Sequence, residues 1–334
     1  MHVIGLTMAT FPSRSLAPWI SALALTLPEC TANVDPALAA ESPPSCSQRL
    51  TGSAQSFTVS VEASEGRNVD LTVFAPEEPG TYPLVAFSHG AFATPGRYAA
   101  MLEPLAGAGF VVLAPMHIDS EEYPRAEGDP DRPPHPITWA TRTEDYALSL
   151  DPPAAVTSAL VAKGLKLDSE RTIALGHSYG ALIAQLPGGA LAFEPDGSQV
   201  DRRNADVDAV VGWSPPAPMP GFMANEGWST LTAPSLTLTG TADILPGFVD
   251  DWKGHKASYD YAPEGARALW VGEGIDHYFG GVFGRVKPVS EPEQALFDRA
   301  LATSLRFIET RISVAQPCTL GSAIAGEMFE EDTN

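Results

Sequence analysis

Ser178 lies in a glycine-flanked motif, residues 176–180 (Gly-His-Ser-Tyr-Gly), which is the part of the chain best suited to nucleophilic chemistry. The apolar run 172–175 precedes the motif and the apolar stretch 181–185 follows it. This order predicts a strand, a sharp turn and a helix, the context in which a G-x-S-x-G motif exposes a serine hydroxyl. The glycines have a physical role there, because the turn strains the backbone and leaves no room for side chains on either side. An incidental serine in a glycine-rich turn is the alternative interpretation.

A nucleophilic serine needs a base, and the base needs an acid that orients it. In an elbow of this type the chain order is Ser, then Asp or Glu, then His. Only His255 and His277 lie downstream of Ser178. His255 is in a polar stretch that we interpret as surface, whereas His277 is in a glycine-rich loop after the apolar run 268–271. We therefore predict His277 as the base; a loop histidine that caps a helix is the alternative.

Asp243 is the predicted acid, because it follows the apolar run 235–239 directly. Asp276 is the chief rival, but it neighbours the predicted base, and adjacent side chains in a tight loop usually point apart. The aspartates at 250–251 are further from the end of the predicted strand. An aspartate that bonds to its own turn backbone is the alternative for Asp243.

An oxyanion hole requires two N–H donors near the serine. The amide of Tyr179, the residue after the serine, is one predicted donor. The second is expected in the loop after the apolar run 84–87, where Gly90 allows a close approach and the Ala91 amide is predicted to donate, with Phe92 as the alternative. We interpret the neighbouring His89 as a packed histidine that shapes this loop.

The elements that must position these residues alternate between strands and helices. Residues 57–61 and 69–74 alternate with period two and predict an antiparallel hairpin. Further strands are predicted at 84–87, 110–114, 172–175, 208–213, 235–239 and 268–271, and helices at 98–108, 138–150, 153–163 and 291–312. This pattern predicts an α/β fold with a mostly parallel, twisted sheet of about eight strands and helices on both faces. Active sites in such sheets lie at the carboxyl ends of the strands, where the candidates are found.

Together these features resemble the α/β-hydrolase superfamily over residues 55–312. Segments 87–90 (Phe-Ser-His-Gly) and 109–112 (Gly-Phe-Val-Val) are similar to the branch that contains platelet-activating-factor acetylhydrolases, chlorophyllases and serine-type relatives of dienelactone hydrolase, together with polyesterases and cutinases. Dienelactone hydrolase itself has cysteine at the position of Ser178, and the best-known polyesterases have methionine and a third glycine where this chain has Tyr179 and Ala181.

The resemblance implies a serine esterase of the EC 3.1.1 type that forms an acyl-enzyme and needs no cofactor. Small to medium esters, including aromatic ones, are the expected substrates. A polyester hydrolase, a lipid acyl hydrolase and a non-catalytic binding protein are the alternatives. The loops at 115–136 and 214–230 should wall the pocket. They and the neighbouring residues supply the predicted substrate contacts Phe92, His135, Trp139, Trp213, Phe222 and Trp228, each of which could instead be a core side chain.

The composition limits the partners. The 334 residues are 44% hydrophobic and carry a net charge of −21. Nucleic acid is an unsuitable partner, because phosphate binding requires a basic surface. No apolar run long enough to cross a membrane lies in the body of the chain. We expect a monomer that meets a small-molecule or polymeric ester.

Residues 1–40 resemble an export leader, with one basic residue, Arg14, before the apolar run 16–27 and small residues at 37–40. A start at Met8, a lipoprotein signal ending at Cys30 and a disordered tail are the alternatives. We expect residues 41–55 to form a loop and residues 56–334 to form the catalytic domain.

Removal of such a leader would leave two cysteines, Cys46 and Cys318, near the two ends of the mature chain. Chain termini often lie close together, so we predict a disulfide and a secreted or periplasmic protein. Two free thiols are the alternative. The cysteine spacing offers no zinc site, and we expect no metal.

Overall fold

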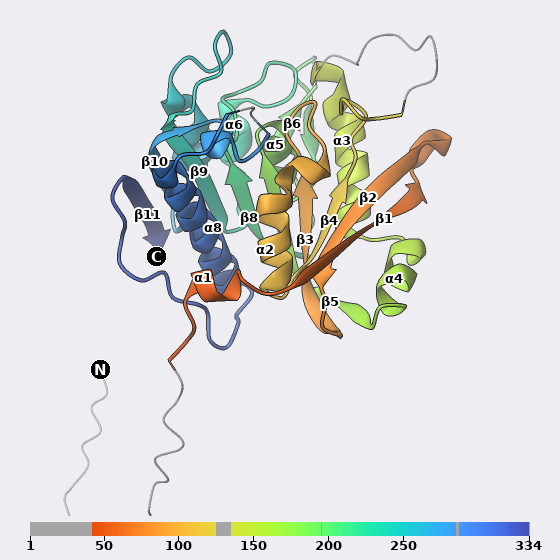
Figure 1. Ribbon diagram of the computed structural model, residues 1–334. Helices are drawn as coiled ribbons and strands as arrows, with labels where there is room; N and C mark the ends of the chain where they lie inside the picture. The colour runs from red at the N-terminus through yellow and green to blue at the C-terminus, as the bar shows by residue number, and fades with distance from the viewer. Residues whose placement is uncertain (1–41, 125–134, 195, 285–286, 334) are drawn as a thin grey trace, which may run out of the picture. The chain divides into compact units, whose positions relative to one another are not determined.

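The centre of the structure, a computed structural model, is a nine-stranded sheet in the order β1-β2-β4-β3-β5-β8-β9-β10-β11 (Figure 1). The structure describes residues 42–124, 135–194, 196–284 and 287–333. The predicted leader lies outside these residues, and Pro43–Asn334 forms one compact unit. The strands of the sheet are β1 Ala54–Glu62, β2 Asn68–Pro76, β3 Gly80–Ser88, β4 Val111–Pro115, β5 Leu165–His177, β8 Val207–Trp213, β9 Ser235–Ala242, β10 Ala266–Asp276 and β11 Glu327–Thr333.

The inner strands, from β4 to β10, run parallel, and the hairpin β1–β2 and strand β11 join them as antiparallel edges. This arrangement confirms the predicted α/β fold. The parallel strands are continuous apolar runs because helices cover both of their faces. A separate two-stranded sheet is formed by β6 Leu191–Phe193 and β7 Gln199–Asp201.

Helices α2 and α8 cover one face of the sheet, and α3 and α5 cover the other (Figure 1). Leu102 of α2 and Leu305 of α8 share one buried cluster, while Tyr146 of α3 and Leu182 of α5 share another. The helices are α1 Cys46–Arg49, α2 Ala99–Gly107, α3 His135–Leu150, α4 Ala154–Val161, α5 Tyr179–Gln185, α6 Asn225–Trp228, α7 Ala257–Tyr261 and α8 Glu291–Arg311. Short 3-10 helices are η2 Ser64–Gly66, η3 Pro95–Tyr98, η4 Trp252–Lys256 and η5 Phe279–Gly281.

Two predictions about the elements need correction. The sheet has nine strands in place of about eight, because β11 pairs with β10 at the edge. The segment 41–55, expected to be a loop, contains helix α1, and β1 already begins at Ala54. Helix α1 begins at a capping box in which Ser45 and Gln48 bond to each other's backbone amides.

The disulfide Cys46–Cys318 joins α1 to the segment after α8, with the two Cα atoms 4.9 Å apart. Hydrogen bonds between backbones support the same junction, since Cys46 N–H donates to the Thr319 carbonyl (3.0 Å). The two ends of the described unit are therefore fixed to each other.

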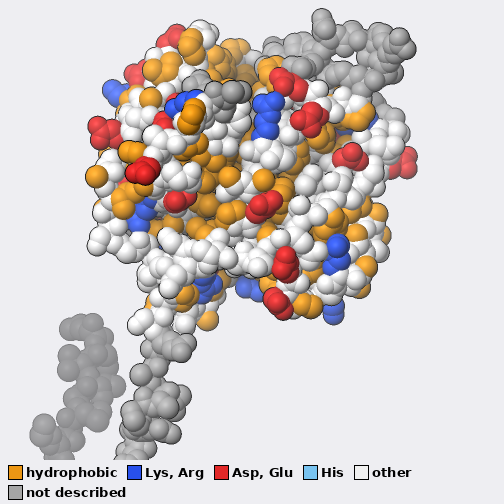
Figure 2. All heavy atoms as spheres, viewed as in Figure 1, with side chains coloured by type: hydrophobic (Ala, Val, Ile, Leu, Met, Phe, Trp, Pro, Cys, Tyr) orange, Lys and Arg blue, Asp and Glu red, His pale blue; other side chains and the backbone are white. Residues whose placement is uncertain are grey.

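Acidic and basic side chains are scattered singly over the face shown in Figure 2, and no basic stripe gathers there. No helix of the described residues is both long and apolar enough to cross a membrane.

Candidate active site

The strained turn around Ser178 connects the end of β5 to the start of α5. Ser178 has φ 55° and ψ −125°, a conformation that non-glycine residues rarely adopt. The glycines two residues before and after it cannot be replaced without a clash: a Cβ on Gly176 would lie 2.2 Å from the Gly180 carbonyl oxygen, and a Cβ on Gly180 would lie 2.0 Å from the Ser88 carbonyl oxygen. The strand, the helix and the neighbouring strand β3 therefore meet at this turn, and they hold the serine in place.

His277 and Asp243 lie beside Ser178 in the order expected of a nucleophile, a base and an acid. His277 Nε2 is 2.8 Å from Ser178 Oγ, and His277 Nδ1 is 2.8 Å from Asp243 Oδ1. Asp243 follows β9 and His277 follows β10, so neighbouring parallel strands bring both side chains to one edge of the sheet. Thr239 Oγ1 donates to Asp243 Oδ2 (2.8 Å) and fixes the carboxylate.

The rival acid, Asp276, has another role. Its Oδ1 accepts hydrogen bonds from the backbone N–H groups of Tyr278 and Gly280, both at 3.0 Å. Asp276 therefore shapes the turn that carries the base.

His255 was expected at the surface, and that interpretation is wrong, because its side chain is fully buried beside Asp243. Nδ1 lies 3.0 Å from the Pro215 carbonyl oxygen and Nε2 lies 2.9 Å from Asp243 Oδ1. The second contact has ion-pair distance but poor hydrogen-bond alignment. Asp243, His255 and His277 thus bring potential ligand atoms within 4.8 Å of one another, as a metal site would, and their contacts with one another account for the cluster.

Asp243 stays charged in this buried place. Burial on its own would raise the pKa of Asp243, but the contacts from His255 and His277 outweigh burial and hold the pKa well below its usual range. An ionised carboxylate can orient His277 and stabilise the imidazolium that forms when the base takes a proton.

The loop after β3 lies against the serine, as an oxyanion hole requires. Ala91 and Tyr179 line the same pocket as Ser178. The alternative donor is less suitable, because the Phe92 amide is directed toward Asp119 Oδ2 at 3.4 Å. The amides of Ala91 and Tyr179 therefore stay the predicted pair of donors.

Arg142 of α3 contacts this loop, and it was not predicted because it lies inside an ordinary helical pattern. Its guanidinium pairs with both carboxylate oxygens of Asp119 (2.8 Å each) and donates to the carbonyls of His89 (2.7 Å) and Gly90 (3.2 Å). The same group lies 4.6 Å from the centre of the Tyr179 ring. Arg142 therefore links the two sides of the predicted oxyanion hole.

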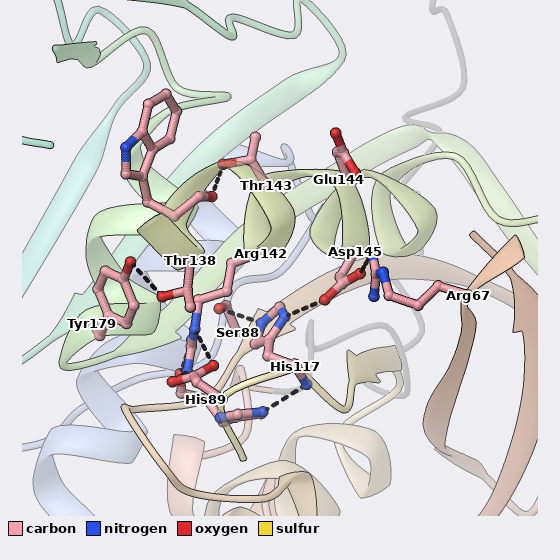
Figure 3. A network of polar contacts seen from close by, with 12 residues as sticks. Arg67, Ser88, His89, His117, Thr138, Arg142, Thr143, Glu144, Asp145 and Tyr179 are labelled. Atoms are coloured by element: carbon pink, nitrogen blue, oxygen red, sulfur yellow. Dashed lines mark hydrogen bonds and ion pairs between the residues drawn. The ribbon is translucent and has the colours of Figure 1, made fainter. Parts of the chain in front are cut away.

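His89 is a packed histidine, in agreement with its predicted role. Its Nδ1 lies 2.7 Å from the Gly90 carbonyl, and its Nε2 accepts the His117 N–H at 3.1 Å. Burial lowers the pKa of His89 well below its usual value, so the ring is neutral. Next to it, buried hydrogen bonds link Ser88 Oγ to His117 Nε2 (2.8 Å) and His117 Nδ1 to Asp145 Oδ2 (3.2 Å) (Figure 3).

A pocket of about 680 Å³ opens over Ser178. Most of its lining is apolar, and the lining also includes the ion pair Arg97–Glu121 (3.0 Å). The apolar lining comes from the loop after β3, the loops after β8 and β9, and the turn after β10: Phe92, Ala93, Pro216, Met219, Pro220, Leu245, Phe248, Tyr278 and Phe283.

Most of the predicted substrate contacts are core residues instead. Phe92 lines the pocket, whereas Trp139, Trp213, Phe222 and Trp228 do not. Trp139 stacks on Phe222 with ring centres 5.3 Å apart, and Trp228 donates to a buried glutamine oxygen (2.7 Å).

Trp213 is also buried, with its ring centre 4.5 Å from that of Phe279. The His135 side chain lies outside the described residues.

Known proteins resemble this chain in sequence and in fold. The model of the chlorophyllase family matches residues 49–215, which is half of the chain. Cutinase 2 of Thermobifida cellulosilytica is 26% identical over 193 residues, covering 57% of this chain and 60% of that protein. A cutinase of Thermobifida fusca (strain YX) is 25% identical over 174 residues, covering 52% of this chain and 46% of that protein. The chain spans about half the length of the curated relatives that it matches.

A crystal structure of a putative dienelactone hydrolase from Klebsiella pneumoniae subsp. pneumoniae has a similar fold. Its TM-score is 0.52 at 17% sequence identity, and the match covers 79% of this chain and 100% of that one. At this identity the likeness concerns the fold alone.

Proposed function

Because the chain belongs to the chlorophyllase family, we propose that it is a secreted serine carboxylesterase that hydrolyses small to medium carboxylic esters, aromatic ones among them. The observation that carries this proposal is the continuous contact from Ser178 Oγ through the His277 ring to Asp243, with both links at 2.8 Å. That arrangement is the one by which a serine becomes a nucleophile at neutral pH.

In the proposed reaction, Ser178 Oγ attacks the ester carbonyl carbon while His277 Nε2 takes the serine proton. The carbonyl oxygen becomes an oxyanion that accepts hydrogen bonds from the amides of Ala91 and Tyr179. The proton then passes from His277 to the leaving alcohol as the C–O bond breaks, which leaves an acyl group on Ser178. Water attacks the acyl carbon while His277 again takes the proton. The bond between the acyl carbon and Ser178 Oγ then breaks, His277 returns the proton to Oγ, and the carboxylic acid product leaves.

The pocket supports an apolar ester. Its lining includes the uncharged side chains of Met219, Leu245 and Phe248, which suit an aliphatic or aromatic substituent. A cutinase-like hydrolase of polyesters is the second candidate, favoured by the names of the curated relatives. Two apolar side chains in the segment that follows Asp243 also favour the polyester hydrolase, because they could contact an extended substrate. These side chains are Ile244, which is 42% exposed, and Phe248, which is 43% exposed.

The experiment is hydrolysis of short and long p-nitrophenyl esters, an aromatic diester, a phospholipid and a polyester film by the wild type and by Ser178→Ala. We expect activity on the short and aromatic esters and a loss on the order of a million-fold in the variant. Unchanged hydrolysis by Ser178→Ala would refute the mechanism. Activity confined to acyl chains longer than about ten carbons, as for a substrate of the lipid type, would refute the short-ester assignment.

Export belongs to the same proposal, and the Cys46–Cys318 disulfide supports it, because such bonds persist in oxidising compartments. The intact mass of the protein recovered from the medium or periplasm should rise by two hydrogens on reduction. A mature protein found only inside the cell, with no such mass change, would contradict export.

A further inference from the structure

The hydroxyl of Tyr98, at the end of η3, lies between two of the segments that form the site. Its oxygen is 3.0 Å from the Gly90 amide nitrogen and 2.9 Å from His177 Nδ1. The side chain is only 2% exposed, and its ring packs against Phe87 and Phe283, each with ring centres 4.9 Å away. The hydroxyl is therefore held in place by the packing of its own ring.

The direction of each hydrogen bond in this series follows from the last acceptor, the His277 carbonyl oxygen. His177 Nε2 is 2.8 Å from the His277 carbonyl oxygen, which can only accept, so Nε2 carries a hydrogen. Burial lowers the pKa of His177 to about 3, so the ring is neutral and Nδ1 is an acceptor. Tyr98 must then donate its hydroxyl hydrogen to Nδ1, which leaves its oxygen to accept the Gly90 N–H.

These hydrogen bonds join the three segments that carry the proposed oxyanion donor, the serine and the base. Gly90 immediately precedes Ala91, a proposed oxyanion donor, and His177 immediately precedes Ser178. The third member is the carbonyl of the base itself, His277. Each of these contacts pairs one donor with one acceptor. A movement of one segment would therefore break a buried hydrogen bond.

We propose that Tyr98 is a positioning residue, whose hydroxyl acts through His177 to fix the oxyanion loop relative to the catalytic serine and base. This inference rests on the proposed esterase function. Donors stabilise an oxyanion only when they are placed before the reaction, so their position affects the transition state more than the bound ester. Loss of the hydroxyl should therefore lower kcat and leave KM nearly unchanged.

The chain offers a matched control in Tyr146, a second buried tyrosine whose hydroxyl also joins two backbone groups. Tyr146 is 1% exposed, donates to the Ala86 carbonyl (2.9 Å) and accepts the Leu175 N–H (3.2 Å). Both of its partners are in the strands beneath the site. Tyr98→Phe and Tyr146→Phe each remove one buried hydroxyl and leave one backbone N–H without that partner, so similar losses of stability are expected.

The test compares the two variants on a short p-nitrophenyl ester, with the active sites counted by a fluorophosphonate probe. We expect Tyr98→Phe to lower kcat about ten- to hundredfold, with KM within about twofold, since loss of a whole oxyanion donor costs about a hundred- to thousandfold. Tyr146→Phe should keep kcat within about twofold. A boronic acid that mimics the tetrahedral intermediate should bind Tyr98→Phe more weakly by the same factor as the loss in kcat/KM.

The outcomes separate this inference from the proposed function. If the wild type and Ser178→Ala hydrolyse the ester equally, the proposed serine mechanism itself fails. If the wild type is active and Tyr98→Phe matches Tyr146→Phe in kcat and in boronic acid affinity, only the positioning role is overturned. Should Tyr98→Phe not fold, His177→Gln, which removes the ring between Tyr98 and His277, takes its place and must show the same loss.

Discussion

At the scale of single residues, Asp243 shows how a buried carboxylate is kept ionised. It accepts a hydrogen bond from Thr239 and contacts two imidazole rings, those of His277 and His255, although none of its surface is exposed. A buried charge without such partners would be neutralised. His255 is therefore expected to support catalysis without touching the substrate.

Replacement of His255 by Gln tests this expectation. The variant loses the ring that lies between Asp243 and the Pro215 carbonyl, so we expect kcat to fall about tenfold at unchanged KM. The unfolding free energy should fall by about 1 to 3 kcal/mol, because the buried Pro215 carbonyl oxygen loses its contact with the His255 ring. Ester kinetics and urea unfolding measure the two effects. Lys253→Gln, an exposed position on the same 3-10 helix, is the control, and equal kcat in both variants would contradict the role.

The sequence predicted the proposed triad because its members follow a motif, two strand ends and a known chain order, all of which are local features. It missed His255 because a polar stretch around a histidine does not show that η4 packs against β9. The aromatic residues Trp139 and Phe222 were assigned to the pocket because they lie in or next to the loops predicted to wall it. In the structure they stack on each other in the core, which removes more apolar surface from water than a place in an open pocket would.

At the scale of elements, the site depends on how closely β3, β5 and α5 approach one another. A Cβ atom on Gly180 would lie only 2.0 Å from the Ser88 carbonyl oxygen. Ser88 ends β3, immediately before the predicted oxyanion loop. An added methyl group would therefore separate the helix from the strand and move the serine and the oxyanion donors apart.

Gly180→Ala should accordingly lower the unfolding free energy by at least about 2 kcal/mol, as overpacking does, and should also lower kcat. Gly96→Ala is the matched control, since its Cβ would meet nothing nearer than 3.9 Å. Urea unfolding and ester kinetics on both variants provide the measurement. A Gly180→Ala protein that is as stable and as active as Gly96→Ala would show that the helix can shift without cost.

The elements were predicted where hydrophobic periodicity is strong and missed where it is weak. The inner strands are apolar on both faces, so their pattern is plain. Strand β11 reads Glu-Met-Phe-Glu-Glu-Asp-Thr, a composition that is poor in strand-forming residues, and it exists because β10 offers it a free edge.

At the scale of the whole molecule, buried neutral histidines link folding to pH. His89, His117 and His177 all lie inside the protein, and burial lowers the pKa of each below the usual 6.5, for His177 to about 3. Below about pH 6.5 the unfolded chain therefore binds protons that the folded protein refuses. Asp145 acts in the opposite direction, because burial raises its pKa to about 6 and the folded state binds a proton between about pH 4 and 6.

The unfolding free energy should thus decrease as the pH falls from about 6.5 to 4. Each of the three histidines takes up one proton on unfolding, which lowers the unfolding free energy by about 1.4 kcal/mol for each pH unit of decrease. Asp145 releases one proton on unfolding and so offsets one of the three histidines. Below about pH 6 the net uptake on unfolding is then about two protons. Urea unfolding at constant ionic strength from pH 7 to 4 measures the slope, and His117→Gln should reduce it by about one proton. A slope near zero, or one unchanged in His117→Gln, would mean that these rings take up protons within the folded protein, so that the buried network under the oxyanion loop opens before the molecule unfolds.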